Sequence, residues 1–333
     1  MAADAGGAVR PVGSVAVIGA GTMGRQIAAL IAASGRQVRL FDAASGALAA
    51  APERIREELR TLPRLPRYAH HAFRLEPPAD HEALLARIGV APSLTAAVIG
   101  ADVVIEAVRE DLETKRTLFA ELDRLAPEAI LATNSSSIPS SLIASAVAAP
   151  GRLLNTHFFA PVWSRPMVEL MGCGETTPET MERVEAFARS LGIVVAPVRG
   201  DSKGFIINRV WRAVKREALR VVDEGHAEPE DVDRLWMIFF GTPSGPFGIM
   251  DMVGLDVVAD IETSYQGVAT DPADQPSAAL HAKLAAGTLG EKTGQGFYDH
   301  PDPEYLSPGW LAGGVEESRS RVVEEETEGG GGG

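Results

Sequence analysis

The sequence predicts an α/β protein: an N-terminal domain with a doubly wound, mostly parallel sheet, followed by an all-α C-terminal domain. Apolar, β-rich segments alternate with helical segments from residue 12 to about residue 200, as βαβ units do. The first apolar segment runs directly into a glycine-rich turn, which is typical of a dinucleotide-binding sheet. Beyond residue 204 the hydrophobic spacing is helical, so the second domain is expected to be helical.

Composition limits the class of protein and its partners. The 333 residues are enough for about two domains. A formal net charge of −14 argues against nucleic-acid and anionic-membrane partners. Cys173 is expected to be chemically inert. Because it is the single cysteine, no internal disulfide can form, and we expect a cytoplasmic protein. The sequence contains no apolar run of signal-peptide type or of membrane-spanning length.

The glycine-rich turn predicts a Rossmann-type site for the pyrophosphate of a dinucleotide. Residues 12–18 have the pattern of a buried strand, and residues 25–34 have that of a helix. The turn between them consists of Gly19, Ala20, Gly21, Thr22, Met23 and Gly24. Gly19 permits the tight turn, Gly21 lets the backbone approach the pyrophosphate, and Gly24 lets helix and strand pack closely. The helix N-terminus favours the negative charge of the phosphates.

An acidic residue predicts which dinucleotide is bound. Residues 37–41 form a second strand pattern that ends at Asp42, about twenty residues after the glycines. A carboxylate there accepts hydrogen bonds from ribose hydroxyls and repels a 2′-phosphate. We therefore expect NAD as the cofactor rather than NADP.

The segment after the second strand shows no metal site. Residues 47–60 are predicted to be helical, residues 61–81 contain four prolines and cannot form a continuous helix, and residues 82–100 return to helix and a short turn. Three histidines fall in or at the end of the proline-rich segment: His70, His71 and His81. Their spacing does not match ligands on one face, so we expect loop or surface residues and no metal.

Polar residues follow the next two predicted strands, residues 101–108 and 130–133. Arg109, Glu110 and Asp111 follow the first of them. Ligands bind at this edge of doubly wound sheets. Residues 111–125 are predicted to form an amphipathic helix that includes Lys115. Residues 134–137, Asn-Ser-Ser-Ser, could cap the next helix or hold a substrate oxygen, and taken alone their composition favours capping.

Residues 155–170 predict a strand, an irregular turn and a second strand. Pro161 and Pro166 exclude a single helix, so the chain doubles back and can bring Glu169 onto His157. A buried carboxylate fixes the tautomer of a histidine and stabilises its protonated form, which suits a general base. From this stretch alone a core histidine satisfied by its neighbours is an equal alternative.

The alternation of strand and helix ends near Gly200, where we place the domain boundary. The predicted parts are an NAD-binding domain over residues 11–200, a helical domain over residues 201–312, and a disordered acidic, glycine-rich tail over residues 313–333. Further predicted elements are a helix over 178–191, a strand over 193–197, helices over 205–224, 229–240 and 249–264, and a glycine-rich loop over 290–298 with Lys292 as its cation.

Several separated motifs together resemble the 3-hydroxyacyl-CoA dehydrogenase family. In order they are GAGTMG, IEAVREDLETK, TNSSSI, THFFAPV with MVEL, GFIINR, SGPFGIMDMVGLD and GEKTGQGFY, over roughly residues 13–300. The resemblance implies NAD-dependent oxidation of an (S)-3-hydroxyacyl thioester, with coenzyme A as the expected carrier. It also implies a cleft between the domains and a homodimer through the helical domain. β-Hydroxyacid dehydrogenases of the hydroxyisobutyrate type share the glycine turn, but their catalytic lysine context is absent here.

The resemblance implies roles residue by residue. His157 is the expected general base, and Glu169 orients it. Ser136 and Asn208 are expected to bond the reacting oxygen or the thioester carbonyl. Expected cofactor contacts are Gly19, Gly21, Thr22, Met23, Gly24, Asp42, Glu110, Lys115, Asn134 and Lys292.

Three departures from the family pattern bear on the substrate. Ala160 stands where the family has asparagine, and Lys203 stands where it has proline. The proline-rich segment 61–81 replaces a lysine-rich hairpin that contacts coenzyme A. Three arginines, Arg60, Arg64 and Arg67, could still meet phosphates there, or be solvated. An acyl-carrier-protein thioester, a free hydroxy acid of the gulonate or carnitine type, and a non-catalytic NAD sensor are therefore the alternatives.

Overall fold

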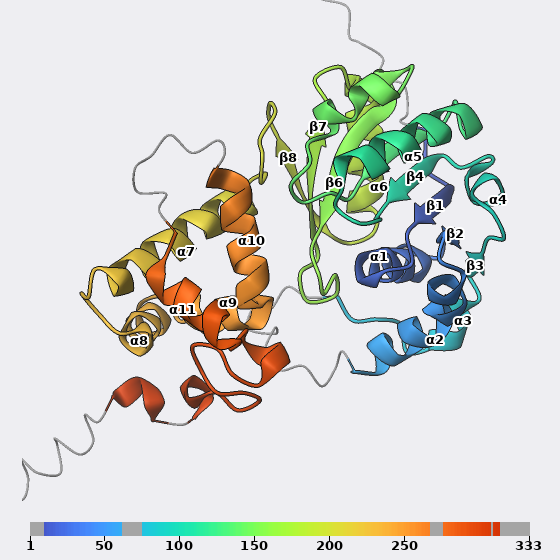
Figure 1. Cartoon of the computed structure of the whole chain (residues 1–333). Helices are drawn as coiled ribbons and strands as arrows, with labels where there is room; N and C mark the ends of the chain where they lie inside the picture. The colour runs from blue at the N-terminus through green and yellow to red at the C-terminus, as the bar shows by residue number, and fades with distance from the viewer. Residues whose placement is uncertain (1–9, 62–74, 267–275, 308, 314–333) are drawn as a thin grey trace, which may run out of the picture. The chain divides into compact units, whose positions relative to one another are not determined.

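The computed structural model describes residues 10–61, 75–266, 276–307 and 309–313 (Figure 1). The chain divides into two compact units, Met1–Arg209 and Val210–Gly333. The predicted tail from residue 314 onward, Arg64, Arg67, His70 and His71 lie outside the described residues. In the described ranges no helix has the length and apolar character needed to cross a bilayer.

The first unit is built on one eight-stranded sheet, which confirms the predicted doubly wound α/β domain. Its strands are β1 (Ser14–Ile18), β2 (Gln37–Phe41), β3 (Ile88–Val90), β4 (Val103–Glu106), β5 (Ile130–Thr133), β6 (Leu153–Phe158), β7 (Met167–Gly172) and β8 (Val194–Val198). The order is β3-β2-β1-β4-β5-β6-β7-β8, and only β6 and β7 pair antiparallel. The strand order reverses between β1 and β4, the point where ligands bind in such sheets.

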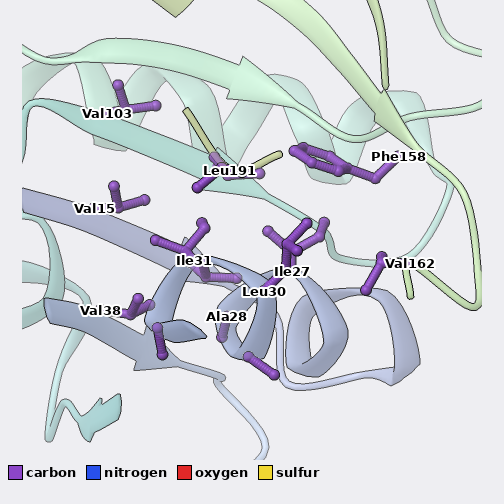
Figure 2. Close-up of a cluster of buried hydrophobic side chains, with 14 of the residues drawn as sticks. Val15, Ile27, Ala28, Leu30, Ile31, Val38, Val103, Phe158, Val162 and Leu191 are labelled. Carbon is purple, nitrogen blue, oxygen red and sulfur yellow. The ribbon is translucent and has the colours of Figure 1, made fainter. Parts of the chain in front are cut away.

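Helices cover both faces of this sheet. They are α1 (Thr22–Ala33), α2 (Ser45–Thr61), α3 (His81–Leu85), α4 (Leu94–Val98), α5 (Leu112–Leu125) and α6 (Pro178–Arg189), with short 3-10 turns at 140–142, 144–146 and 150–152. Alternate side chains of β1 pack on opposite faces of the sheet, because successive side chains of a strand point in opposite directions. Val15 packs in one cluster with Ile27 of α1 (Figure 2), whereas Ala16 packs in the other with Phe119 of α5.

The sequence did not predict β3. It is three residues long and lies at the edge of the sheet, and two of its residues are exposed. Such a segment has little hydrophobic pattern, and its pairing with β2 alone defines it as a strand.

The second unit is helical, as predicted. Its helices are α7 (Ile207–Asp223), which begins before the division, α8 (Pro229–Phe240), α9 (Pro246–Val253), α10 (Leu255–Gln266) and α11 (Ala278–Ala286), with 3-10 turns at 291–293, 304–306 and 310–312. The single helix expected over 249–264 is wrong, because Gly254 has a φ of 97° and separates α9 from α10. Helix α11 was not predicted.

Two buried carboxylates, Asp233 and Asp251, organise the core of this unit. Asp233 of α8 accepts hydrogen bonds from the backbone N–H groups of Phe247 (2.9 Å) and Gly248 (2.8 Å) at the start of α9, and from the Tyr298 hydroxyl (3.0 Å). Burial raises the pKa of Asp233 to about 6, and the neighbouring Asp251 adds to that rise, although the three hydrogen bonds act against it. The carboxylate thus holds the loop between α8 and α9 at an electrostatic cost.

This raised pKa predicts a pH-dependent stability. In the folded protein the Asp233 carboxyl binds its proton more tightly than it does in the unfolded chain. Its contribution to the free energy of unfolding therefore falls as pH rises from 4 to 6. The difference in free energy of unfolding between wild type and Asp233→Asn, from denaturant titrations, is expected to fall by about 2 kcal/mol between pH 4 and pH 7. A difference that stays constant over that range would contradict this assignment.

Candidate active site

A pocket of about 820 Å³ lies in the first unit at the carboxyl ends of β1, β2 and β4. Its lining includes Gly19, Gly21, Asp42, Val108, Arg109, Thr114 and Glu121. The edge of a parallel sheet at a reversal of strand order is the expected place for a dinucleotide. The predicted glycine turn and the predicted acidic residue therefore line one pocket.

The geometry of the glycine turn agrees with the role predicted for each glycine. Gly19 has a φ of 112°, and a Cβ there would lie 2.4 Å from the carbonyl oxygen of Ala107. A Cβ on Gly24 would lie 1.8 Å from the carbonyl oxygen of Gly19. A Cβ on Gly21 would meet no atom within 4 Å, so a ligand can approach this backbone. No side chain caps α1, which leaves the N–H groups of its first turn, where Thr22 and Met23 lie, for an anion.

Asp42 and Arg25 fix the peptide groups of Ala20 in the middle of this turn. The Ala20 N–H donates to Asp42 Oδ2 at 2.7 Å, and Arg25 Nη1 donates to the Ala20 carbonyl at 2.9 Å. Arg25 is itself held by Glu58 of α2, with Nε 3.0 Å from Oε1. Arg25 and Glu58 were not predicted as site residues from the sequence. Arg25 directly follows Gly24 near the start of α1, and this position does not distinguish a buried arginine from an exposed one.

The predicted chain reversal brings His157 and Glu169 together. They are directly opposite each other in the antiparallel β6–β7 pair, and His157 Nδ1 lies 2.9 Å from Glu169 Oε2. The other oxygen of Glu169 accepts hydrogen bonds from the N–H groups of Ile206 (2.9 Å) and Ile207 (2.8 Å) at the start of α7. These contacts satisfy both carboxylate oxygens.

The turn before α7 places aromatic rings around the imidazole. Phe205 has a φ of 55°, a left-handed conformation that is unusual for a bulky residue. Its ring lies 4.9 Å from that of His157, centroid to centroid, and the Phe159 ring lies at 4.3 Å. Because a carboxylate can only accept hydrogen bonds, the contact with Glu169 requires that Nδ1 of His157 act as the donor. Nε2 is then left as the basic nitrogen.

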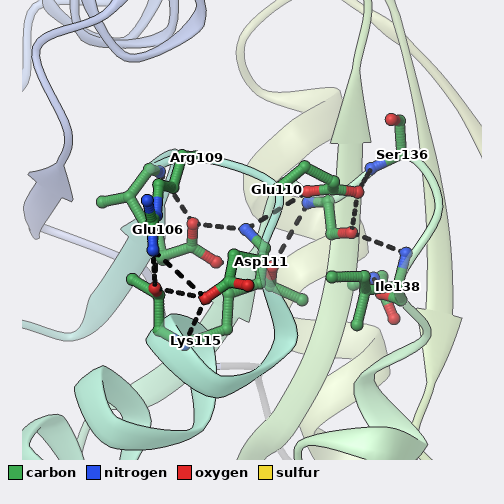
Figure 3. Close-up of polar contacts among 12 residues, drawn as sticks. Glu106, Arg109, Glu110, Asp111, Lys115, Ser136 and Ile138 are labelled. Atoms are coloured by element: carbon green, nitrogen blue, oxygen red, sulfur yellow. Dashed lines mark hydrogen bonds and ion pairs between the residues drawn. The ribbon is translucent and has the colours of Figure 1, made fainter. Parts of the chain in front are cut away.

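The serine loop, residues 134–138, is fastened to Glu110 (Figure 3). Oε1 of Glu110 accepts hydrogen bonds from the N–H groups of Ser136 (3.1 Å) and Ser137 (2.9 Å) and from the hydroxyls of Ser135 and Ser137. The expectation that these hydroxyls cap the next helix is wrong, since the 3-10 turn at 140–142 has no side-chain cap. Glu110 lies at the same edge of the sheet and offers a full charge, which makes it the stronger acceptor.

A buried ion pair, formed by Lys115 and Glu106, lies next to Glu110. Lys115 of α5 donates to Glu106 at 2.6 Å and lies 3.4 Å from the second oxygen of Glu110. Only 1% of the Lys115 side chain is exposed, and that of Glu106 is fully buried. Burial alone would raise the pKa of Glu110, but Lys115 and the bonds from Ser135 and Ser137 outweigh it and hold that pKa below its ordinary value. Glu110 is therefore ionised at neutral pH.

The remaining predicted site residues occupy three places. Asn134 accepts a hydrogen bond from the Phe158 N–H at 2.9 Å, beside His157 in β6. The Asn208 amide lies 3.5 Å from the Ser136 carbonyl. These contacts bring Asn134, Ser136 and Asn208 together with the His157 pair. Lys292 belongs to the second unit, where it pairs with Asp256. Within the described ranges no group of three or more metal-ligating side chains occurs.

The first unit thus holds a dinucleotide-binding turn and a paired histidine and carboxylate that can transfer a proton. NAD carries the redox chemistry, and the protein supplies position and proton transfer. Together these features place the protein among NAD-dependent dehydrogenases that act on an alcohol or a carbonyl.

The chain belongs to the 3-hydroxyacyl-CoA dehydrogenase family. The family's NAD-binding domain matches residues 14–202, and its C-terminal domain matches residues 204–300. These matches cover both predicted domains and confirm the resemblance drawn from the motifs. The chain is thus an NAD-dependent 3-hydroxyacyl-CoA dehydrogenase.

Individual relatives are similar in sequence to this chain over most of their length. A mitochondrial hydroxyacyl-coenzyme A dehydrogenase of Sus scrofa is 35% identical over 291 residues, covering 86% of this chain and 90% of the relative. A probable 3-hydroxybutyryl-CoA dehydrogenase of Bacillus subtilis is 35% identical, covering 86% and 97%. The crystal structure of an (S)-3-hydroxybutyryl-CoA dehydrogenase from Ralstonia eutropha matches with a TM-score of 0.77 at 31% identity, covering 87% and 100%.

Proposed function

We propose that the enzyme oxidises the 3-hydroxyl of a short (S)-3-hydroxyacyl-CoA to the 3-oxo thioester, and reverses the reaction, with His157 as the general base. The observation that carries this proposal is the 2.9 Å contact between His157 Nδ1 and Glu169 Oε2. A short acyl group is proposed because two of the relatives described above are named for 3-hydroxybutyryl-CoA.

In this proposal Nε2 of His157 takes the proton of the substrate hydroxyl. Glu169 holds the ring in the required tautomer and stabilises the imidazolium that forms, since its carboxylate lies against Nδ1. Bound NAD supplies the hydride acceptor. The rings of Phe159 and Phe205 exclude water from the sides of the imidazole, which strengthens its interaction with Glu169.

The other site residues bind and orient the substrate or the cofactor in this proposal. Ser136 and Asn208 hydrogen-bond the reacting oxygen or the thioester carbonyl. The cofactor is held at its pyrophosphate by the glycine turn, including Thr22 and Met23, and at a ribose by Asp42. Further proposed cofactor contacts are Glu110, Lys115, Asn134 and Lys292.

The acyl carrier is the least constrained part of the proposal. Ala160 offers no amide where the family has asparagine, so one polar contact must be replaced or lost. A carrier-protein thioester and a free hydroxy acid carry the same 3-hydroxyl, and His157 could deprotonate either one. The intact His157–Glu169 pair argues against a non-catalytic NAD sensor. A cytoplasmic location remains a prediction.

Replacing the base provides the test of this function. His157→Ala is expected to lower kcat for NADH-dependent reduction of acetoacetyl-CoA by about 10²- to 10⁴-fold, the usual contribution of a general base. The dissociation constant of NADH, measured by fluorescence, should stay near the wild-type value. Wild-type turnover that is absent with CoA, carrier-protein and free-acid substrates, while NADH still binds, would instead favour a sensor.

We further propose a homodimer through the second unit. Helix α8 carries four large apolar side chains that are more than half exposed: Leu235, Ile238, Phe239 and Phe240. Phe239 is 82% exposed and stacks edge-on against Phe240 at 4.8 Å between ring centroids. A contiguous apolar patch of this kind is typical of a surface covered by a partner.

A charge in this patch should prevent dimer formation. Phe239→Asp is expected to convert the protein from a dimer to a monomer of 35.2 kDa, measured by light scattering after size-exclusion chromatography. Ile99→Asp is the matched control, because Ile99 is 63% exposed and belongs to the first unit, whereas the α8 patch belongs to the second. A wild-type protein that is monomeric at micromolar concentration would contradict the proposal.

A further inference from the structure

We propose that Arg25 is a positioning residue for cofactor binding. Held by Glu58 of α2, it fixes the Ala20 carbonyl and so keeps the glycine turn in the shape that presents its N–H groups to the pyrophosphate. This inference rests on the pyrophosphate-binding role proposed above for the turn. It deepens that role by naming an ion pair that raises the affinity of the turn for the dinucleotide.

The first step is the hold that Arg25 has on the backbone of the turn. Its side-chain Nη1 donates to the Ala20 carbonyl at 2.9 Å, and its backbone N–H donates to the Gly21 carbonyl at 3.0 Å. The carbonyl and the N–H of one planar, trans peptide group point in opposite directions. Fixing these two carbonyls therefore also fixes the directions of the N–H groups of Gly21 and Thr22.

These N–H groups lie where an anion would bind. The bond from Arg25 to Gly21 is the first hydrogen bond of α1, so the N–H groups of Thr22 and Met23 have no acceptor within the helix. Such groups at the start of a helix bind phosphate well when they point in one direction. Arg25 thus orients donors that it does not itself replace.

The second step is the anchor of the guanidinium. Nε of Arg25 lies 3.0 Å from Oε1 of Glu58, and Nη2 donates to the same oxygen. With Nη1 bound to Ala20, all three nitrogens of the planar group are engaged, so it cannot rotate without losing one of these bonds. Helix α2 thereby sets the direction in which Arg25 meets the turn.

The third step distinguishes positioning from direct contact with the cofactor. Only 8% of the Arg25 side chain is exposed. Gly19, Gly21 and Asp42 line the 820 Å³ pocket, whereas Arg25 does not. A guanidinium that is buried behind the turn and fully engaged has no free edge for a phosphate, so its effect on the cofactor passes through the Ala20 and Gly21 peptide groups.

Binding of cofactor fragments tests this inference. Arg25→Met removes the guanidinium and keeps most of the apolar bulk. It should raise the dissociation constants of NADH and of ADP-ribose, which carries the pyrophosphate without nicotinamide, by about tenfold, the value of one good hydrogen bond. The dissociation constant of adenosine, which has no phosphate, should change by less than about twofold. So should kcat for acetoacetyl-CoA reduction at saturating NADH, because the substrate site is untouched.

Two further variants test the anchor. Glu58→Gln keeps Arg25 and the size of its partner, so it should weaken NADH and ADP-ribose binding in the same pattern but by a smaller factor. Arg25→Lys should restore part of the affinity lost in Arg25→Met, because one ammonium cannot bind both Ala20 and Glu58 as the guanidinium does.

Arg152→Met is the matched control. Arg152 also joins a carboxylate to a loop carbonyl, since it pairs with Asp123 and donates to the Ala129 carbonyl at 2.6 Å. Ala129 directly precedes β5, whereas the glycine turn follows β1, and both strands run parallel to β4. This contact therefore lies at the opposite edge of the sheet, and the variant should keep the wild-type dissociation constants.

The outcomes separate this inference from the role of the turn. If ADP-ribose binds the wild-type protein no more tightly than adenosine does, the turn does not hold the pyrophosphate, and both proposals fail. If ADP-ribose binds more tightly but neither Arg25→Met nor Glu58→Gln weakens it, only the positioning by Arg25 is overturned. A loss that adenosine and ADP-ribose share equally would also overturn it, as would the same loss in Arg152→Met.

Discussion

The arrangement of the active site depends on one carboxylate, that of Glu169. One of its oxygens lies against the His157 imidazole, and the other accepts the N–H groups of Ile206 and Ile207. The oxygens of a buried carboxylate need hydrogen-bond donors, and here those donors come from strand β6 and from the start of α7. The same contacts that satisfy Glu169 therefore fix the orientation of the base. They also explain why Phe205 holds a left-handed conformation directly before those donors.

Asp42 and Glu110 bind backbone N–H groups of two other loops in the same way. Asp42 accepts from Ala20 in the glycine turn and from Ala44, and Glu110 accepts from Ser136 and Ser137 in the serine loop. Each of these acids follows or ends a strand, and each orders a loop that carries a proposed ligand contact. In a chain with a net charge of −14, these acids order the loops around the site. Arg25 and Lys115, both buried, compensate part of this local negative charge.

Sequence patterns predicted those features that depend on local chemistry. The glycine turn follows from its spacing between strand and helix, and Gly24 proves necessary because a Cβ there would meet the Gly19 carbonyl. The approach of His157 to Glu169 followed from two prolines between apolar segments, and the exact pairing in β6 and β7 agrees.

The features that sequence patterns missed depend on contacts between distant segments. A serine run has the composition of a cap, and only the fold brings Glu110 to it from the end of another strand. Lys115 occurs in an ordinary amphipathic pattern, and its burial follows from Glu106, nine residues earlier in the chain. Gly254 lies within an apolar helical pattern, so its positive φ, which splits α9 from α10, had no distinctive signal.

The most direct test of this account is the position of the proton on the His157 imidazole, measured by ¹⁵N NMR of histidine-labelled enzyme. The account predicts that Nδ1 is protonated and Nε2 is not at a pH where the ring is neutral, and that Glu169→Gln disturbs this preference together with kcat. A neutral His157 with its proton on Nε2, or a preference for Nδ1 that survives Glu169→Gln unchanged, would contradict it.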